Sequence, residues 1–172
     1  MSCSSECHHA QVPTIATIGV YGFSADDFLA RLLEARVGLV LDVRQRRGVR
    51  GSEYAWANSQ RLQSALADAG IAYSHHAELA PTTELRQLQY AVDAETGIGK
   101  RNREVLAPAY VERYEREILA NVDLGPIADA LPARGAAALF CVESDPEACH
   151  RSLIADRLAA EYGAEVVHIR PT

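Results

Sequence analysis

Short apolar runs alternate with amphipathic stretches along most of the chain. The apolar runs are only a few residues long and several are β-branched, which is typical of strands. Between them, apolar residues recur three and four positions apart, as they do on one face of a helix. Such alternation favours an α/β fold: a mostly parallel, open sheet of about five strands with helices on both faces. The predicted strands are residues 14–20, 37–43, 71–75, 136–142 and 166–169.

Polar residues mark where several of the predicted helices begin. Ser24 and Asp27 form an S-x-x-D start signal in front of an apolar helical face. Asn58 is placed to cap the second helix. Either Ser144 or Asp145 is expected to cap the last helix, with a proline in its first turn.

The middle of the chain is less regular. Residues 84–93 predict a helix with Leu85, Leu88 and Val92 aligned on its apolar side. A second helix is predicted over residues 108–120. The polar, glycine-containing segment between them is interpreted as a surface loop.

Length and composition indicate one ordinary domain. The chain has 172 residues, of which 48% are apolar, so it has enough apolar side chains for a core. We predict a flexible tail over residues 1–12 and a single α/β domain over residues 13–172. The N-terminal segment lacks the basic-then-apolar order of a signal peptide, and the apolar runs are too short to span a bilayer. We therefore expect a cytoplasmic protein without a membrane partner.

Charge and cysteine content narrow the function classes. The formal net charge of −6 argues against a general nucleic-acid coat, which needs a basic face. The positive charge is almost all arginine, with Lys100 the only lysine, and arginine favours planar contacts to carboxylate or phosphate. The four cysteines are too few and too scattered for a disulfide framework, and in the cytosol they are expected to be reduced.

Three short motifs occur in order along the chain. They are Thr17-Ile18-Gly19, then Leu41-Asp42-Val43-Arg44, then Cys141-Val142-Glu143 followed by Cys149-His150-Arg151. Together they resemble the domain-of-unknown-function 488 family, and the third motif is the most specific. The resemblance covers about residues 14–169 and implies the α/β fold and the location of a site. Because that family has no settled activity, the resemblance implies no reaction.

Two of these motifs lie at the carboxyl ends of predicted strands, residues 37–43 and 136–142. In open α/β sheets, ligands bind beyond the carboxyl ends of the strands, so both motifs are expected to border one crevice if the two strands are neighbours. Arginines and a helix N-terminus suit an anionic ligand, whereas a solvated arginine loop is the alternative. The predicted substrate-binding residues are Asp42, Arg44, Arg46, Arg47, Arg50, Arg151 and Cys141, and the predicted catalytic residues are Cys149, His150 and Glu143.

Cys149 is the candidate reactive thiol. A cysteine near a helix N-terminus, beside histidine and arginine, is expected to have a lowered pKa. His150 then serves as a base or orients the thiol. The alternative is that Cys149 only packs the helix against the sheet. Cys141 is interpreted as a core residue unless it reaches the end of its strand, where it could join Cys149 in a redox or metal role. For Asp42 the alternative is a structural role, holding Arg44 or a loop N–H.

No cofactor is clearly implied by the sequence. Cys3, Cys7, His8 and His9 have the ligand chemistry of a zinc site, but their spacing matches no standard finger. Adventitious zinc, or no metal, is the expectation for them.

Three functional hypotheses follow. The first is an enzyme acting on a small anionic substrate, phosphorylated, nucleotide-like or carboxylated. The second is a binding module for nucleotide or single-stranded nucleic acid, which uses the loop at residues 44–56 and which the net charge disfavours. The third is a non-catalytic interaction or regulatory protein in which the Cys-His-Arg turn is purely structural.

Overall fold

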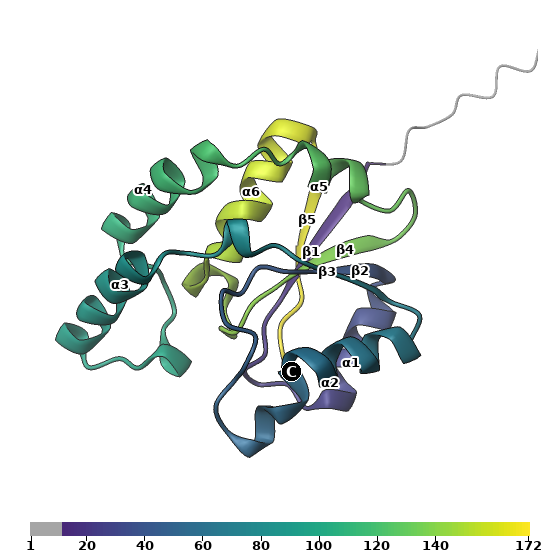
Figure 1. The fold of residues 1–172 in the computed structure, drawn as a ribbon, viewed down its shortest axis with the longest axis horizontal. Helices are drawn as coiled ribbons and strands as arrows, with labels where there is room; N and C mark the ends of the chain where they lie inside the picture. The colour runs from purple at the N-terminus through teal and green to yellow at the C-terminus, as the bar shows by residue number, and fades with distance from the viewer. Residues whose placement is uncertain (1–11) are drawn as a thin grey trace, which may run out of the picture.

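The structure, a computed structural model, describes residues 12–172. Its centre is a five-stranded sheet in which every paired strand is parallel, in the order β3-β2-β4-β1-β5 (Figure 1). This confirms the predicted fold class. The residues Cys3, Cys7, His8 and His9 lie outside the described range. The strands are β1 (Thr14–Ile18), β2 (Val37–Asp42), β3 (Ala72–His75), β4 (Ala136–Phe140) and β5 (Glu165–His168).

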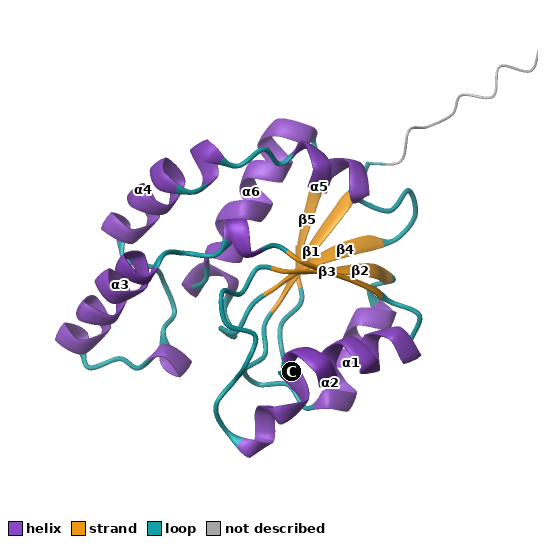
Figure 2. Cartoon of the chain, in the orientation of Figure 1, coloured by secondary structure: helices purple, strands orange, loops and turns teal. Residues whose placement is uncertain are grey.

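Helices cover both faces of the sheet (Figure 2). Helices α1 and α2 lie on one side, and α6 lies on the other with α3 and α4 beyond it (Figure 2). Across residues 12–172, every helix is too short or too polar to cross a membrane. The helices are α1 (Ala25–Glu34), α2 (Ser59–Asp68), α3 (Thr83–Thr96), α4 (Pro108–Glu117), α5 (Gly125–Ala130) and α6 (His150–Tyr162).

Local sequence explains the best-predicted elements. In front of α1, the Ser24 hydroxyl accepts a hydrogen bond from the Asp27 N–H at 3.2 Å and donates one to the Asp27 carboxylate at 2.8 Å. This confirms the start signal, and Phe28 and Leu32 form the buried face of that helix. All five residues of β4 are buried, because helices cover the sheet on both faces.

The start of α6 corrects a prediction. Pro146–Ala148 forms a separate single turn of 3-10 helix after Asp145. Cys149 then has an extended backbone, which breaks the helical path, and α6 begins at His150. Neither Ser144 nor Asp145 caps α6; Cys149 occupies its N-cap position.

Helix α3 also differs from its prediction. Its buried face contains Leu85, Gln89 and Asp93, whereas Leu88 and Val92 are only half-buried. Two polar side chains therefore occupy the inward face of this helix. A prediction from apolar spacing alone misses such a face, because the partners that make burial of polar groups favourable are distant in sequence.

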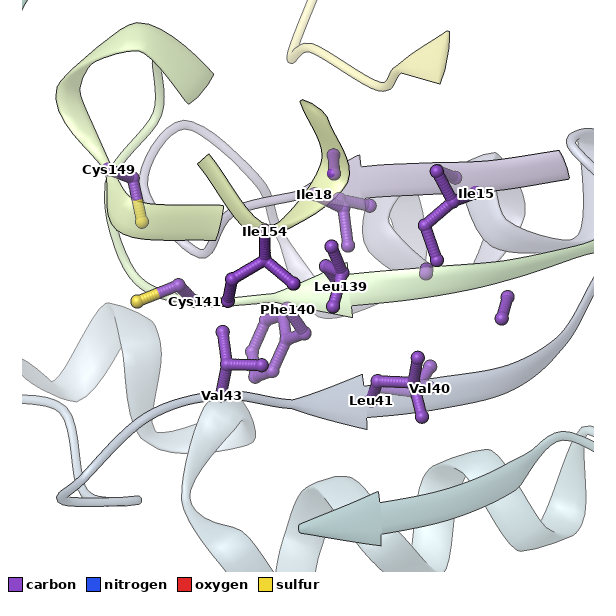
Figure 3. Close-up of a cluster of buried hydrophobic side chains, with 14 of the residues drawn as sticks. Ile15, Ile18, Val40, Leu41, Val43, Leu139, Phe140, Cys141, Cys149 and Ile154 are labelled. Carbon is purple, nitrogen blue, oxygen red and sulfur yellow. The ribbon is translucent and has the colours of Figure 1, made fainter. Parts of the chain in front are cut away.

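Strand order determines where a ligand can enter. Neighbouring strands β2 and β4 end side by side, with Asp42 opposite Phe140. The helix that follows β2 lies on one face of the sheet, and the helix that follows β4 lies on the other (Figure 2). Crevices for ligands form at such points in open α/β sheets. The second and third motifs of the sequence flank this position, and Figure 3 shows Cys141 and Cys149 there, at the edge of the apolar core.

Candidate functional site

A cavity of about 460 Å³ lies at the carboxyl ends of β2 and β4. This volume is within the range of small-molecule sites. Its described lining contains six cationic side chains but a single carboxylate, that of Glu143. The cations are Arg44, Arg46, Arg50, Arg86, Lys100 and Arg103.

The Arg44 guanidinium is hydrogen-bonded to other groups of the protein. Its guanidinium is buried and donates to both carboxylate oxygens of Asp42, at 2.9 and 2.8 Å, and to the carbonyl of Ala57 at 2.9 Å. The Tyr73 hydroxyl donates to the same Asp42 carboxylate at 2.6 Å. The charges of Asp42 and Arg44 therefore compensate each other, which supports a positioning role for both.

Arg151 is likewise enclosed. Its guanidinium donates to the carbonyl oxygens of Glu143 at 2.6 Å and Ser144 at 3.0 Å. These bonds fix the loop after β4 to the first turn of α6. The loop after β1 packs against it so closely that a Cβ atom at Gly19 would lie 1.9 Å from the Glu143 carbonyl oxygen. Gly19, part of the first motif, therefore has a steric role that positions the loop carrying Glu143.

Three arginines give the cavity its uncompensated positive charge. Within residues 12–172, Arg46, Arg50 and Arg86 have no carboxylate at salt-bridge distance. Arg47, in contrast, lies 3.5 Å from the Tyr73 hydroxyl and borders a different, open hollow. The structure thus brings Arg46 and Arg50 of the predicted loop to the cavity and turns Arg47 away.

A buried polar network attaches α3 to the site. The Gln89 amide accepts from the Ala107 N–H at 2.8 Å and donates to Asp93 at 2.9 Å, and Asp93 also accepts from Arg103 Nε at 3.0 Å. Burial raises the pKa of Asp93. The hydrogen bonds from Arg103 and Gln89, together with the nearby cationic charge, lower it by more, so the net shift of the pKa is downward. Arg103 continues the network to Glu143, 3.8 Å away.

The two carboxylate oxygens of Glu143 differ in whether they have a partner. Its Oε1 atom lies 3.5 Å from the Lys100 ammonium and 3.8 Å from the Arg103 guanidinium. Its Oε2 atom is buried and lacks a hydrogen-bond partner among the described residues. A buried carboxylate oxygen with no partner is unusual, and it is available to a ligand or a proton.

The thiol and imidazole groups converge beside Glu143. Cys149 Sγ lies 3.7 Å from His150 Nδ1, and Cys141 Sγ belongs to the same cluster, whose three ligand atoms all lie within 4.8 Å of one another. His150 Nε2 lies 2.9 Å from the Val43 carbonyl oxygen. Because a carbonyl only accepts, Nε2 carries a proton, and in the neutral ring the Nδ1 lone pair faces Cys149.

These neighbours favour a thiolate at Cys149. Burial raises the pKa of Cys149, but the Cys141 hydrogen bond and the charges of His150 and Arg151 bring it well below its ordinary value. The pKa of His150 is raised: burial lowers it, but the adjacent Cys149 outweighs burial. The pKa of Cys141 is raised well above its usual value, first by its hydrogen bond to Cys149. A thiolate is the reactive form of cysteine, both as a nucleophile and as a metal ligand.

Several cavity residues have no counterpart among the predicted ones. Arg86, Gln89 and Tyr90 come from α3, and Lys100 and Arg103 come from the segment after it. The segment predicted as a surface loop thus forms one wall of the site. A signal was present, because polar side chains recur at four-residue spacing on one face of α3, following Leu85.

Comparison with known proteins confirms the family resemblance. The family model described as Domain of unknown function DUF488 matches residues 24–158. The matched range contains β2 and β4, whose ends frame the cavity, and the N-terminal part of α6. Neither the curated proteins nor the solved structures contain a significant match.

Proposed function

The chain belongs to the family of Domain of unknown function DUF488, and from the geometry of the site we propose that it is an enzyme acting on a small anionic substrate. The observation that carries this proposal is the cation-lined cavity with Cys149, His150 and Glu143 in its wall. Phosphorylated, nucleotide-like or carboxylated compounds are the substrate classes that fit such a lining.

The roles divide between unpaired arginines and the buried side chains of the reacting centre. Arg46, Arg50 and Arg86 bind the anionic group, because their charges are not compensated by protein carboxylates in the described chain. Cys149, His150 and Glu143 form the reacting centre, where a thiolate, an imidazole and a carboxylate meet the bound substrate. The concave shape strengthens each of these interactions, since water screens charges less inside a cavity than on an open surface.

The shape of the cavity favours a small molecule over a nucleic-acid strand. Its cations line one hollow of about 460 Å³. Tyr54, an aromatic residue of the loop at residues 44–56 to which that hypothesis assigns binding, packs against Tyr21 with ring centroids 5.2 Å apart. The Arg101 guanidinium lies 5.3 Å from both ring centroids. These rings already have protein partners, which disfavours the single-strand binding hypothesis.

Thermal unfolding with a small anion tests the binding half of the proposal. At about a hundred times its Kd, adenosine monophosphate is expected to raise the Tm of the wild-type chain by about 5 °C or more. The double variant Arg46→Gln/Arg50→Gln should lose most of this rise. The matched control Arg116→Gln/Arg157→Gln, in which both arginines pair with glutamates on helix surfaces, should keep it.

Product formation tests the catalytic half. Anions that stabilise the protein are incubated with it, and conversion is followed by mass spectrometry. Cys149→Ser should keep the Tm rise and abolish conversion, since the arginines remain in place. If phosphate, nucleoside monophosphates and small dicarboxylates all leave the wild-type Tm unchanged, the proposed function is wrong.

A further inference from the structure

Cys141, Cys149 and His150 have the chemistry and spacing of metal ligands. Their ligand atoms lie within 4.8 Å of one another, and all three residues are buried. The distance between Cys149 Sγ and His150 Nδ1 is 3.7 Å. A sulfur and a nitrogen bound to one tetrahedral zinc ion are roughly 3.6 Å apart, given zinc–ligand bonds of about 2.3 and 2.0 Å. These two groups could therefore share a zinc ion with little movement.

The hydrogen bond between His150 and the Val43 carbonyl orients the imidazole ring for metal binding. Its Nε2 atom faces the Val43 carbonyl at 2.9 Å, so Nδ1 offers its lone pair toward the sulfur atoms. Histidines that bind metals almost always donate their other ring N–H to a carbonyl or carboxylate in this way.

The backbone holds the three ligands on two anchored elements. Cys141 directly follows β4, and its N–H donates to the Ile18 carbonyl at 3.2 Å. Cys149 is the N-cap of α6 and His150 is its first residue. Arg151 links both elements through its bonds to the loop after β4. Ligands held in this way need little reorganisation when an ion binds.

One side of the cluster is open to the cavity. Cys141, Cys149 and His150 all contribute to the cavity lining, and so does Glu143, two residues beyond Cys141. The Oε2 atom of Glu143 is the buried carboxylate oxygen without a partner in the described chain. Three protein ligands plus one open position is the arrangement of catalytic zinc sites. A neighbouring carboxylate that is not a ligand acts as the proton acceptor in some of them.

We propose that Cys141, Cys149 and His150 bind one zinc ion, that a water occupies its fourth position, and that Glu143 accepts a proton from that water. Metal binding itself is independent of the proposed function, but its use in a reaction rests on the anionic-substrate enzyme proposed above. The reaction class is hydrolysis. The water oxygen bonds to the electrophilic atom of the substrate, and the bond to the leaving group breaks. The proton passes from water to Glu143 and then to the leaving group, so no oxidant or reductant is required.

Cobalt titration of the full-length, metal-stripped chain tests the site. Co²⁺ replaces zinc in tetrahedral sites and reports thiolate ligands by a near-ultraviolet charge-transfer band and tetrahedral geometry by visible bands. We expect both sets of bands to saturate at one ion per chain and to disappear when zinc is added. Cys149→Ala should remove the charge-transfer band, and Cys141→Ala serves the same purpose if Cys149→Ala does not fold.

A matched control separates this cluster from the other cysteines. The double variant Cys3→Ser/Cys7→Ser removes the thiols near the N-terminus and should keep the bands of the wild-type chain. The proposal is wrong if the wild-type chain shows no thiolate charge-transfer band. It is also wrong if the band survives in Cys149→Ala and Cys141→Ala but is lost in Cys3→Ser/Cys7→Ser.

The two proposals fail in different ways. If adenosine monophosphate raises the wild-type Tm but cobalt gives no thiolate band, the zinc site is wrong and the anion site stands, with the Cys149 thiolate as its reactive group. If cobalt binds as expected but no small anion changes the Tm, the zinc site stands and the proposed substrate class is wrong. The Arg46→Gln/Arg50→Gln variant should bind cobalt as the wild-type chain does.

Discussion

At the scale of single residues, burial separates arginines that hold loops from arginines that line the cavity. Arg44 and Arg151 are almost fully buried and donate to protein oxygens. Arg46 and Arg50 are exposed and face the cavity without carboxylate partners in the described chain. A few side chains therefore determine the positive charge that a bound anion would meet, and the negative charge of Glu143 reduces it.

Replacing Glu143 tests this charge balance. Glu143→Gln removes the carboxylate of the described cavity lining while keeping the size of the side chain. Because a nearby negative charge is lost, adenosine monophosphate should bind about fivefold more tightly, a gain of about 1 kcal/mol. Calorimetric titration measures the change. Glu147→Gln is the control, since that carboxylate pairs with Arg170 on the surface and should leave the affinity unchanged. Weaker binding to Glu143→Gln would contradict the proposed placement of the anion.

The Asp93 carboxylate should make stability depend on acid pH. Its pKa is lowered in the folded chain, because the hydrogen bonds from Arg103 and Gln89 outweigh the opposing effect of burial. Asp93 therefore contributes its full stabilisation above its unfolded pKa of about 3.9, and that contribution is lost as the pH falls through the folded-state pKa. Asp93→Asn should lower the free energy of unfolding at neutral pH by on the order of 3 kcal/mol, since Arg103 is left buried without its partner.

Urea unfolding at neutral pH and near pH 3 measures this effect. The difference between wild type and Asp93→Asn should shrink in acid, because protonation removes the same charge from the wild-type chain. Asp129→Asn, an exposed position in α5, should show little difference at either pH. An equal difference at both pH values would mean that the ion pair does not account for the contribution of Asp93.

At the scale of elements, the site depends on how closely the loops after β1 and β4 approach each other. The N–H groups of Val20 and Tyr21 both donate to the Val142 carbonyl at 3.0 Å. Gly19 lies at the same crossing, where its missing side chain leaves room for the Glu143 carbonyl. The loop that carries Glu143 is thus supported by a neighbouring strand end as well as by Arg151.

Gly19→Ala should disturb this crossing. The added methyl group would lie 1.9 Å from the Glu143 carbonyl oxygen, so one of the two loops must move. We expect a loss of at least about 2 kcal/mol in the free energy of unfolding, together with weaker anion binding. Gly38→Ala is the control, because the nearest atom to its added methyl group is 4.0 Å away. Equal unfolding free energies for the two variants would show that the crossing tolerates a side chain.

Elements whose burial follows simple spacing could be predicted from the sequence. The apolar run of β4 and the start signal at Ser24 correspond to a buried strand and a capped helix. The start of α6 was misplaced because Pro146 begins a separate turn before the extended Cys149. The inward face of α3 was misplaced because Gln89 and Asp93 are buried in a polar network. Apart from the bond between them, their partners in it, Ala107 and Arg103, are ten or more positions away.

At the scale of the whole molecule, the sheet order brings distant segments together. β4 lies between β2 and β1, which places the Cys-His-Arg turn beside the arginine loop. Local patterns predicted that the Cys-His-Arg turn and the arginine loop lie at the same edge of the sheet. The order of the strands, however, cannot be predicted from any short motif. Lys100 and Arg103 reach the cavity from the segment between α3 and α4, so a chain of net charge −6 has a cationic cavity that composition alone does not predict.

The most direct test of an anion site beside Cys149 is alkylation of each cysteine, resolved by peptide mapping. Chelator-treated protein is exposed to iodoacetamide at about pH 6, where a cysteine with an ordinary pKa reacts slowly. We expect Cys149 to react faster than Cys3 and Cys7, because its pKa lies well below the usual value. Adenosine monophosphate should then slow the alkylation of Cys149 and leave the alkylation rates of the other cysteines unchanged. If Cys149 reacts only after unfolding, or if the anion has no effect on its rate, the cavity is not the anion site that we propose.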